Sequence, residues 1–292
     1  LADKENPEYK LILASTLRAL NQTDNAVSLI NSIIQNYPEY AEAYALRAFL
    51  MYQMANFEHA LADAHKALKI KPWLSKLRSI IIKVYTQTRN YPEAIKFLEE
   101  SLCQDPHNVD IMSSLGELKR KTLCMQDALE ILKKATDLEP DNTNALINFG
   151  AALQEMGSIA EARKAYEKAM AKKPDSAEIA NNLGCLAKDE QDWSTALSYF
   201  QKAIALQPEQ VEFYPNLARA LSETGRFKDA ETIARNVISK APNYEEGYLS
   251  LAGSFWKNGK IEESFEILED IISRFPHSAE PLFRYAEYLS EI

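Results

Sequence analysis

The chain has 292 residues, of which 46% are hydrophobic and 26% charged, and its formal net charge at pH 7 is −9. This composition supplies a buried core, so an intrinsically disordered chain is excluded. The negative charge argues against nucleic acid and anionic lipid as partners, because binding phosphates requires a basic face. No apolar run approaches the roughly 18 residues that span a bilayer, so direct membrane insertion is not expected.

The first 30 residues lack a basic stretch followed by an apolar core, so no signal peptide is apparent. The chain has three cysteines, Cys103, Cys124 and Cys185, which is too few for a disulfide framework. Unpaired thiols favour the reducing cytoplasm, although the sequence alone leaves the localisation undetermined.

Prolines recur every 34 residues without insertion or deletion, at 38, 72, 106, 140, 174, 208, 242 and 276. Such self-similarity indicates a repeat array in which each unit packs on its neighbours, so one continuous body is expected instead of two globular domains. With the proline at position 32, the array spans 7–278. Its eight repeats are 7–40, 41–74, 75–108, 109–142, 143–176, 177–210, 211–244 and 245–278. A lead segment, 1–6, precedes them.

Each repeat predicts two helices, A and B. Positions 4, 7 and 11 carry the apolar face of helix A, as Leu146, Phe149 and Leu153 do in the fifth repeat. Position 8 in helix A and position 20 in helix B hold mostly alanine or glycine, which allows the two helix backbones to approach closely. The proline at position 32 cannot continue helix B and therefore ends it. Glycines at position 15 fit the C-terminal cap of helix A, at Gly157, Gly225 and Gly259.

These eight in-phase units resemble the tetratricopeptide-repeat (TPR) family over essentially the whole chain. The resemblance implies an all-α fold, a right-handed α-solenoid (superhelix) of eight tandem 34-residue helix-turn-helix repeats plus a C-terminal capping helix. It also implies that the A helices line a concave groove, with positions 2, 5, 6, 9, 12 and 13 facing it. The expected ligand of such a groove is a protein or a peptide.

Repeats 2 to 4 depart most from this pattern. Arg47 and Lys119 replace apolar residues at positions 7 and 11, and Ile82 is bulky at position 8. We expect the two basic side chains to bury their stems and keep their charges in water, the alternative being a specific ion pair. A locally different curvature or a more hydrated junction is expected in these repeats.

Residues 279–292 are predicted to form a capping helix or a ninth helix A. Leu282, Tyr285 and Leu289 repeat the apolar face at positions 4, 7 and 11, and Ala286 falls on position 8. The other side is polar, as expected of a terminal helix that covers the last apolar face and presents a soluble one.

Three consecutive repeats carry asparagine at position 6, namely Asn148, Asn182 and Asn216. An amide side chain offers a donor and an acceptor to a peptide group. Helices spaced about 10 Å apart would contact an extended peptide, which advances about 3.3 Å per residue, at roughly every third residue. The row is similar to the asparagine ladder in the TPR domain of O-GlcNAc transferases. The alternative is that the three asparagines are solvated and reflect recent duplication.

Further groove candidates surround this row. Polar contacts are expected from Asn144, Asn181, Lys188 and Arg219, and an exposed aromatic contact from Trp256. The groove of the first repeats is more apolar, with Phe49 and Tyr52 as candidate anchors. Acidic residues at position 2 of most repeats favour basic peptides, although acids in a first helical turn also complement the helix dipole.

No catalytic, metal or cofactor site is predicted. The four histidines are scattered without an i, i+4 pair, and the glycines form no phosphate-binding loop. We therefore expect a non-enzymatic scaffold that binds peptide segments or folded partners along the groove. The alternative is the substrate-recruiting arm of a larger enzyme, such as an O-GlcNAc-transferase-like glycosyltransferase. Self-association through the B helices stays open.

Overall fold

The computed structural model describes residues 6–292, and the regular structure within that range is entirely helical. The predicted lead segment 1–6, apart from Asn6, lies outside the described residues. The A helices are α1 (Pro7–Ala19), α3 (Ala41–Gln53), α5 (Lys76–Gln87), α7 (Val109–Lys121), α9 (Thr143–Glu155), α11 (Ala177–Asp189), α13 (Tyr214–Glu223), α15 (Glu245–Lys257) and α17 (Glu280–Glu291).

The B helices alternate with the A helices, one in each predicted repeat. They are α2 (Thr23–Asn36), α4 (Phe57–Ile70), α6 (Tyr91–Gln104), α8 (Met125–Leu138), α10 (Ile159–Lys172), α12 (Trp193–Leu206), α14 (Phe227–Lys240) and α16 (Ile261–Arg274). A short 3-10 turn, η1 (Val211–Phe213), precedes α13. Pro215 explains this turn, because it has no N–H with which to continue an α-helical first turn.

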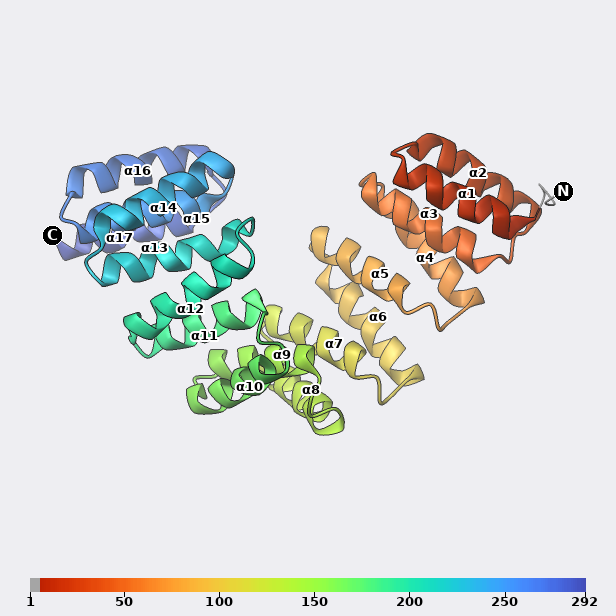
Figure 1. The fold of residues 1–292 in the computed structure, drawn as a ribbon, viewed down its shortest axis with the longest axis horizontal. Helices are drawn as coiled ribbons and strands as arrows, with labels where there is room; N and C mark the ends of the chain where they lie inside the picture. Colours follow the sequence, from red (N-terminus) through yellow and green to blue (C-terminus); the bar gives the residue numbers. More distant parts are fainter. Residues whose placement is uncertain (1–5) are drawn as a thin grey trace. The chain divides into compact units, whose positions relative to one another are not determined.

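The helices form two compact units, unit 1 (Leu1–Gln104) with α1–α6 and unit 2 (Asp105–Ile292) with α7–α17. Within each unit the two helices of a repeat lie side by side (Figure 1). In unit 2, α7 lies against α9 and α13 against α15, so consecutive A helices form a layer of their own. The repeat spacing predicted one continuous array, and the boundary between the units falls near the end of the third repeat.

Small residues at positions 8 and 20 are buried where A and B helices cross. The position-20 alanine is fully buried in seven repeats, and so is Ser264 in the eighth, where its hydroxyl donates to the Ala252 carbonyl at 2.9 Å. A Cβ on any of three position-8 glycines would come within 3.0 Å of the side chain at position 24 of helix B. These pairs are Gly116 with Leu132, Gly150 with Tyr166, and Gly184 with Phe200. A large residue on helix B therefore fills the space that glycine leaves on helix A.

The third repeat lacks this complementarity. Both positions hold branched side chains there, Ile82 at position 8 and Leu98 at position 24. Ile82 is only partly buried, whereas the preceding Ile81 is fully buried. Helices α5 and α6 accordingly pack less closely than the paired helices of the other repeats. The loosening is confined to the third repeat, and the curvature or hydration expected of repeats 2 to 4 stays a prediction.

All eight repeats place position 15 in the left-handed backbone region. The predicted cap glycines have φ of +74° to +78°, so their interpretation is confirmed. The same conformation is imposed on five residues that have a side chain, with φ of +54° to +62°: Asn21, Ala55, Arg89, Leu123 and Gln191. The turn geometry is therefore set by the packing of the helix pair, and glycine only makes it less costly.

Arg47 does not keep its charge in water as expected. Its Nε and one Nη each donate to a carboxylate oxygen of Asp63 at 2.7 Å, and its other Nη donates to Asn31 at 2.6 Å. Asp63 is only 5% exposed, so a buried carboxylate on α4 requires this partner. The hydrogen bonds that Arg47 donates to Asp63 raise the pKa of Arg47. The ion-pair alternative is correct here. Lys119 lies 3.2 Å from Asp127, whose carboxylate is exposed.

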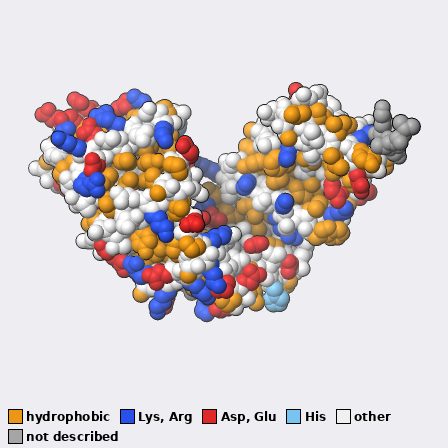
Figure 2. Space-filling model, viewed as in Figure 1, with side chains coloured by type: hydrophobic (Ala, Val, Ile, Leu, Met, Phe, Trp, Pro, Cys, Tyr) orange, Lys and Arg blue, Asp and Glu red, His pale blue; other side chains and the backbone are white. Residues whose placement is uncertain are grey.

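Helix α17 follows the register of a ninth helix A but does not present a purely polar outer side. Leu282 and Leu289 are 55% and 51% exposed, and Ala286 is also exposed. In a complete repeat, positions 4, 8 and 11 face the repeat's own helix B. Helix α17 packs on α16, the helix B of the preceding repeat, and among the described residues no helix B of its own repeat covers these positions. Apolar side chains also reach the surface elsewhere in both units, among charged ones (Figure 2).

Candidate functional site

A hollow of about 590 Å³ lies along three A helices of unit 2. Its walls come from α13, α15 and α17, which carry the concave positions of the last repeats. Three residues predicted for the groove line it: Asn216, Arg219 and Trp256. The sequence pattern therefore places these three side chains in one site, as the TPR resemblance implies for A helices.

Two serine hydroxyls lie buried in the lining of this hollow. Ser222 is 5% and Ser254 is 2% exposed, and their Oγ atoms are 3.1 Å apart. Each Oγ also lies within hydrogen-bond distance of the carbonyl four residues earlier, at 3.1 Å for Ser222 and 2.8 Å for Ser254. The two hydroxyls have only two protons for these three contacts, one between the serines and one to each carbonyl. The serine oxygens therefore keep lone pairs that can accept a hydrogen bond from an external donor.

Helix α17 closes one side of the hollow through aromatic packing. The rings of Trp256 and Tyr288 stack with centroids 4.2 Å apart and planes within 4°. The indole Nε1–H of Trp256 donates to Glu291 at 3.2 Å. Burial raises the pKa of the Tyr288 phenol, and the charges of Arg284 and Arg219 oppose this shift. Trp256, expected to be an exposed aromatic, is therefore half-buried beneath α17.

The hollow carries an excess of negative charge. Its lining holds three cations, Arg219, Lys257 and Arg284, against six glutamates, at 223, 245, 246, 280, 287 and 291. Two of the three cations are already paired, because Lys257 lies 3.0 Å from Glu223 and Arg284 lies 3.0 Å from both Glu280 and Glu287. Glu246 is exposed and forms no ion pair with a described residue.

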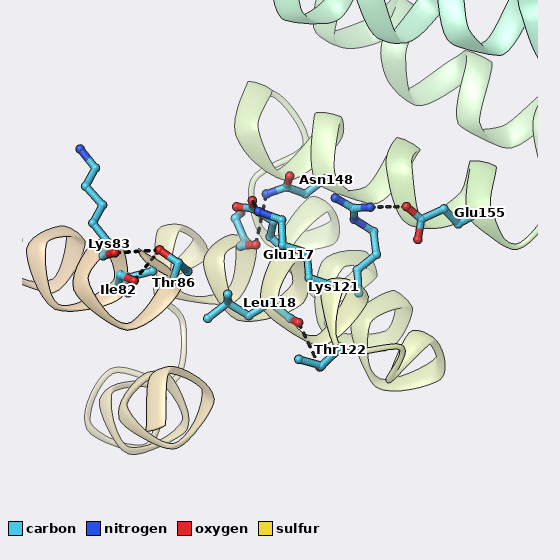
Figure 3. A network of polar contacts seen from close by, with 11 residues as sticks. Ile82, Lys83, Thr86, Glu117, Leu118, Lys121, Thr122, Asn148 and Glu155 are labelled. Carbon is cyan, nitrogen blue, oxygen red and sulfur yellow. Dashed lines mark hydrogen bonds and ion pairs between the residues drawn. The ribbon is translucent and has the colours of Figure 1, made fainter. Parts of the chain in front are cut away.

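Two of the three ladder asparagines tie neighbouring A helices together. The Nδ2 of Asn148 donates to the Ser113 carbonyl on α7 at 3.2 Å (Figure 3). The Nδ2 of Asn216 donates to Asn181 Oδ1 on α11 at 3.1 Å and approaches Cys185 Sγ at 3.7 Å. Asn182 makes no side-chain hydrogen bond within the described chain, and it is half-buried on α11. The row is therefore partly structural, a role that neither sequence alternative anticipated.

A second row of contacts links position 12 of one A helix to position 13 of the next. Arg120 pairs with Glu155 (Figure 3), and Gln154 Nε2 donates to Asp189 at 2.6 Å. The Trp256–Glu291 bond continues the row onto α17. These contacts join α7 to α9, α9 to α11 and α15 to α17 along their polar faces.

The remaining predicted residues lie at other points along the A helices. Asn144 is exposed on α9, and Lys188 lies on α11, 3.5 Å from Asp189. Phe49 and Tyr52 lie on α3 in unit 1, packed partly into its core. The guanidinium of Arg18 lies 4.9 Å from the Phe49 ring centroid, and the Tyr52 ring is 6.1 Å from that of Phe57.

Sequence reasoning missed the serine pair and Tyr288. Position 10 could have found Ser254 and Tyr288, because most repeats carry an apolar residue there, whereas Ser222 lies at position 12 and has no such signal. Among residues 6–292, no group of histidine, cysteine and acidic side chains is arranged to hold a metal ion. None of the helices described is both long and apolar enough to cross a membrane.

Two family models described as tetratricopeptide repeat match the chain, one over residues 125–183 and 187–253, the other over 9–40 and 246–278. Paired antiparallel helices with small residues at each crossing define a helical-repeat protein. The matched segments together cover more than half of its length, and the chain belongs to the tetratricopeptide-repeat family. None of the curated protein sequences matches it.

Solved structures confirm the predicted all-helical TPR solenoid fold. The chain is similar to yeast Tom70, with 16% identity and a TM-score of 0.65 over 99% of this chain and 64% of that one. It is similar to PilW, a type IV pilus biogenesis factor, with 21% identity and a TM-score of 0.63 over 73% of this chain and 99% of that one. Pseudomonas aeruginosa PilF matches with 19% identity and a TM-score of 0.55 over 71% and 94%.

Proposed function

We propose that the chain is a non-catalytic interaction scaffold and that the A-helix groove of unit 2 binds an extended segment of a partner protein. The observation that carries this proposal is the hollow of about 590 Å³ along α13, α15 and α17, which combines polar groups with an aromatic pair. A concave site of this size with a few convergent polar groups is the usual form of a ligand site.

The asparagine row supplies the backbone contacts in this proposal. Asn182 offers both a donor and an acceptor, since its side chain forms no hydrogen bond with a described residue. Asn148 and Asn216 each donate a hydrogen bond from Nδ2 to the preceding A helix. Their Oδ1 atoms can still accept hydrogen bonds from peptide N–H groups. The three amides would thus hold a peptide backbone with little dependence on its side chains.

The contacts between A helices favour binding by lowering its entropic cost. Arg120 with Glu155 and Gln154 with Asp189 join helices that would otherwise have to be ordered by the ligand. A groove that is already arranged loses less conformational freedom when a peptide enters. Less of the favourable contact energy is then offset by the cost of ordering the groove, so the peptide binds more tightly.

The test begins with a selection of random 12-residue displayed peptides on the intact chain. Selected sequences are synthesised with a fluorophore, and their Kd is measured by fluorescence anisotropy. Asn182→Ala should weaken binding about fivefold, the equivalent of one lost hydrogen bond of about 1 kcal/mol. Gly253→Trp should nearly abolish it, because Gly253 lines the hollow and a Cβ there has no neighbour nearer than 3.6 Å.

The matched control is Asn236→Ala, which removes an exposed asparagine from the B helix α14. It should leave Kd unchanged. Failure to select any peptide, or selected peptides that bind Gly253→Trp and Asn182→Ala as tightly as the parent chain, would refute the proposed groove. Thermal melting of each variant separates lost binding from lost folding.

A further inference from the structure

We propose that the hollow between α13, α15 and α17 receives a lysine or arginine side chain of the bound segment. This inference rests on the proposed function and assigns its ligand chemistry. The hollow lies wholly within unit 2, and its walls are joined by contacts between α13 and α15 and by the aromatic pair of Trp256 on α15 and Tyr288 on α17.

The charge of the lining carries the first step. Six glutamates face three cations, and Lys257 and Arg284 are already neutralised by glutamates of the same lining. A carboxylate entering this space would meet excess negative charge, with Arg219 as the one lining cation that forms no ion pair with a described residue. A cationic side chain would instead gain from unpaired Glu246 and from the net field of the walls.

The buried serines carry the second step, independently of the acidic residues. Ser222 and Ser254 contribute two hydroxyl protons to three short contacts, so they can accept but have no spare proton to donate. Ammonium and guanidinium groups are donors only, whereas a carboxylate is an acceptor only. The serine pair in the lining therefore complements a basic side chain and not an acidic one.

The aromatic pair carries the third step. Trp256 and Tyr288 both line the hollow and supply aromatic surface there. The methylene stem of lysine or arginine packs on aromatic surface while its charged head stays near polar groups. A long, cationic side chain can contact the aromatic residues, the serine oxygens and the glutamates of the lining at the same time.

Arg219 makes the inference easy to overturn. This residue is exposed in the lining and forms no ion pair with a described residue, so it would repel a cationic ligand and attract an anionic one. Arg219→Gln should tighten binding of a basic peptide about threefold. If the hollow takes an acidic side chain, the same substitution weakens binding.

The experiment uses peptides selected on the intact chain, each resynthesised with one lysine or arginine at a time replaced by norleucine, which keeps the stem and removes the charge. One replacement should weaken binding about tenfold. The unmodified peptide should bind Glu246→Gln about threefold more weakly than it binds the parent chain. The loss of affinity caused by the norleucine replacement should be correspondingly smaller in Glu246→Gln, and a double-mutant cycle measures this difference.

Glu212→Gln is the matched control, because Glu212 occupies the same repeat position one repeat earlier, is exposed and does not line the hollow. Its effect should stay below twofold. Peptides that bind through the groove but lack a basic residue, or that respond equally to both glutamine variants, would overturn this inference and leave the proposed function standing. Failure to select any groove-binding peptide would overturn both.

Discussion

The two units are built by the same repeat but present different A-helix faces. In unit 1 position 6 is apolar in all three repeats, as Ile12, Leu46 and Ile80, and Ile12 is 63% exposed. In unit 2 three repeats carry asparagine at this position, as Asn148, Asn182 and Asn216, and the hollow that Asn216 lines is acidic. Groove positions can diverge in this way because they take no part in the helix crossings, which positions 8 and 20 hold constant.

The units also differ because unit 1 contains the one loosely packed repeat of the described chain. The glycines at position 8 of unit 2 match large side chains at position 24, whereas Ile82 and Leu98 in unit 1 leave no space for each other. The comparison shows that the side chains at positions 8 and 24 must complement each other in size. This complementarity, and not a small residue at one position alone, determines how closely the two helices of a repeat approach.

The largest expected effect is at a close glycine crossing of unit 2. Gly150→Leu would drive a side chain into the ring of Tyr166, which already lies 2.7 Å from the place of a Cβ. The free energy of unfolding should fall by about 3 kcal/mol through overpacking. Chemical denaturation followed by circular dichroism measures this loss.

Its control is Gly253→Ala, at another helix-A glycine of unit 2 whose added Cβ would meet only the Tyr288 hydroxyl at 3.6 Å. The control should be neutral or slightly stabilising, because alanine has the higher helix propensity. An unchanged unfolding curve for Gly150→Leu would mean that the assigned repeat register is wrong.

A middle-sized effect tests the mismatch in unit 1. Ile81→Ala should cost about 3 kcal/mol because Ile81 is fully buried, whereas Ile82→Ala should cost less than about 1 kcal/mol because it removes a partly exposed side chain from a crowded crossing. Hydrogen exchange of α5 and α6 amides follows both variants. Equal losses at the two sites would contradict the role given to Ile82.

The smallest effect concerns the left-handed turns in both units. Ala55→Gly in unit 1 and Leu123→Gly in unit 2 should each stabilise the chain by about 1 kcal/mol, since both residues adopt positive φ. Gly225→Ala should destabilise it by a similar amount. Thermal melting measures all three, and a loss of stability in the two glycine variants would show that the turn geometry is not a source of strain.

Much of the site could be predicted and part of it could not. Asn216, Arg219 and Trp256 converge on the hollow because repeat position alone decides which way a helix-A side chain points. The partners of Asn148 and Asn216 on preceding helices could not be predicted, because they depend on the distance between helices that are 35 residues apart in sequence. The Arg47–Asp63 pair escaped prediction for the same reason.

The sequence by itself determined the repeat length, the pairing of helices A and B and the residues at each crossing, since these follow from local periodicity and from prolines and small residues at fixed spacing. Only the tertiary structure decided that Ile82 loosens its repeat, that two asparagines serve as links between helices, and that Trp256 stacks beneath α17. These features depend on how side chains from different helices share a small space, and a one-dimensional pattern does not contain that information.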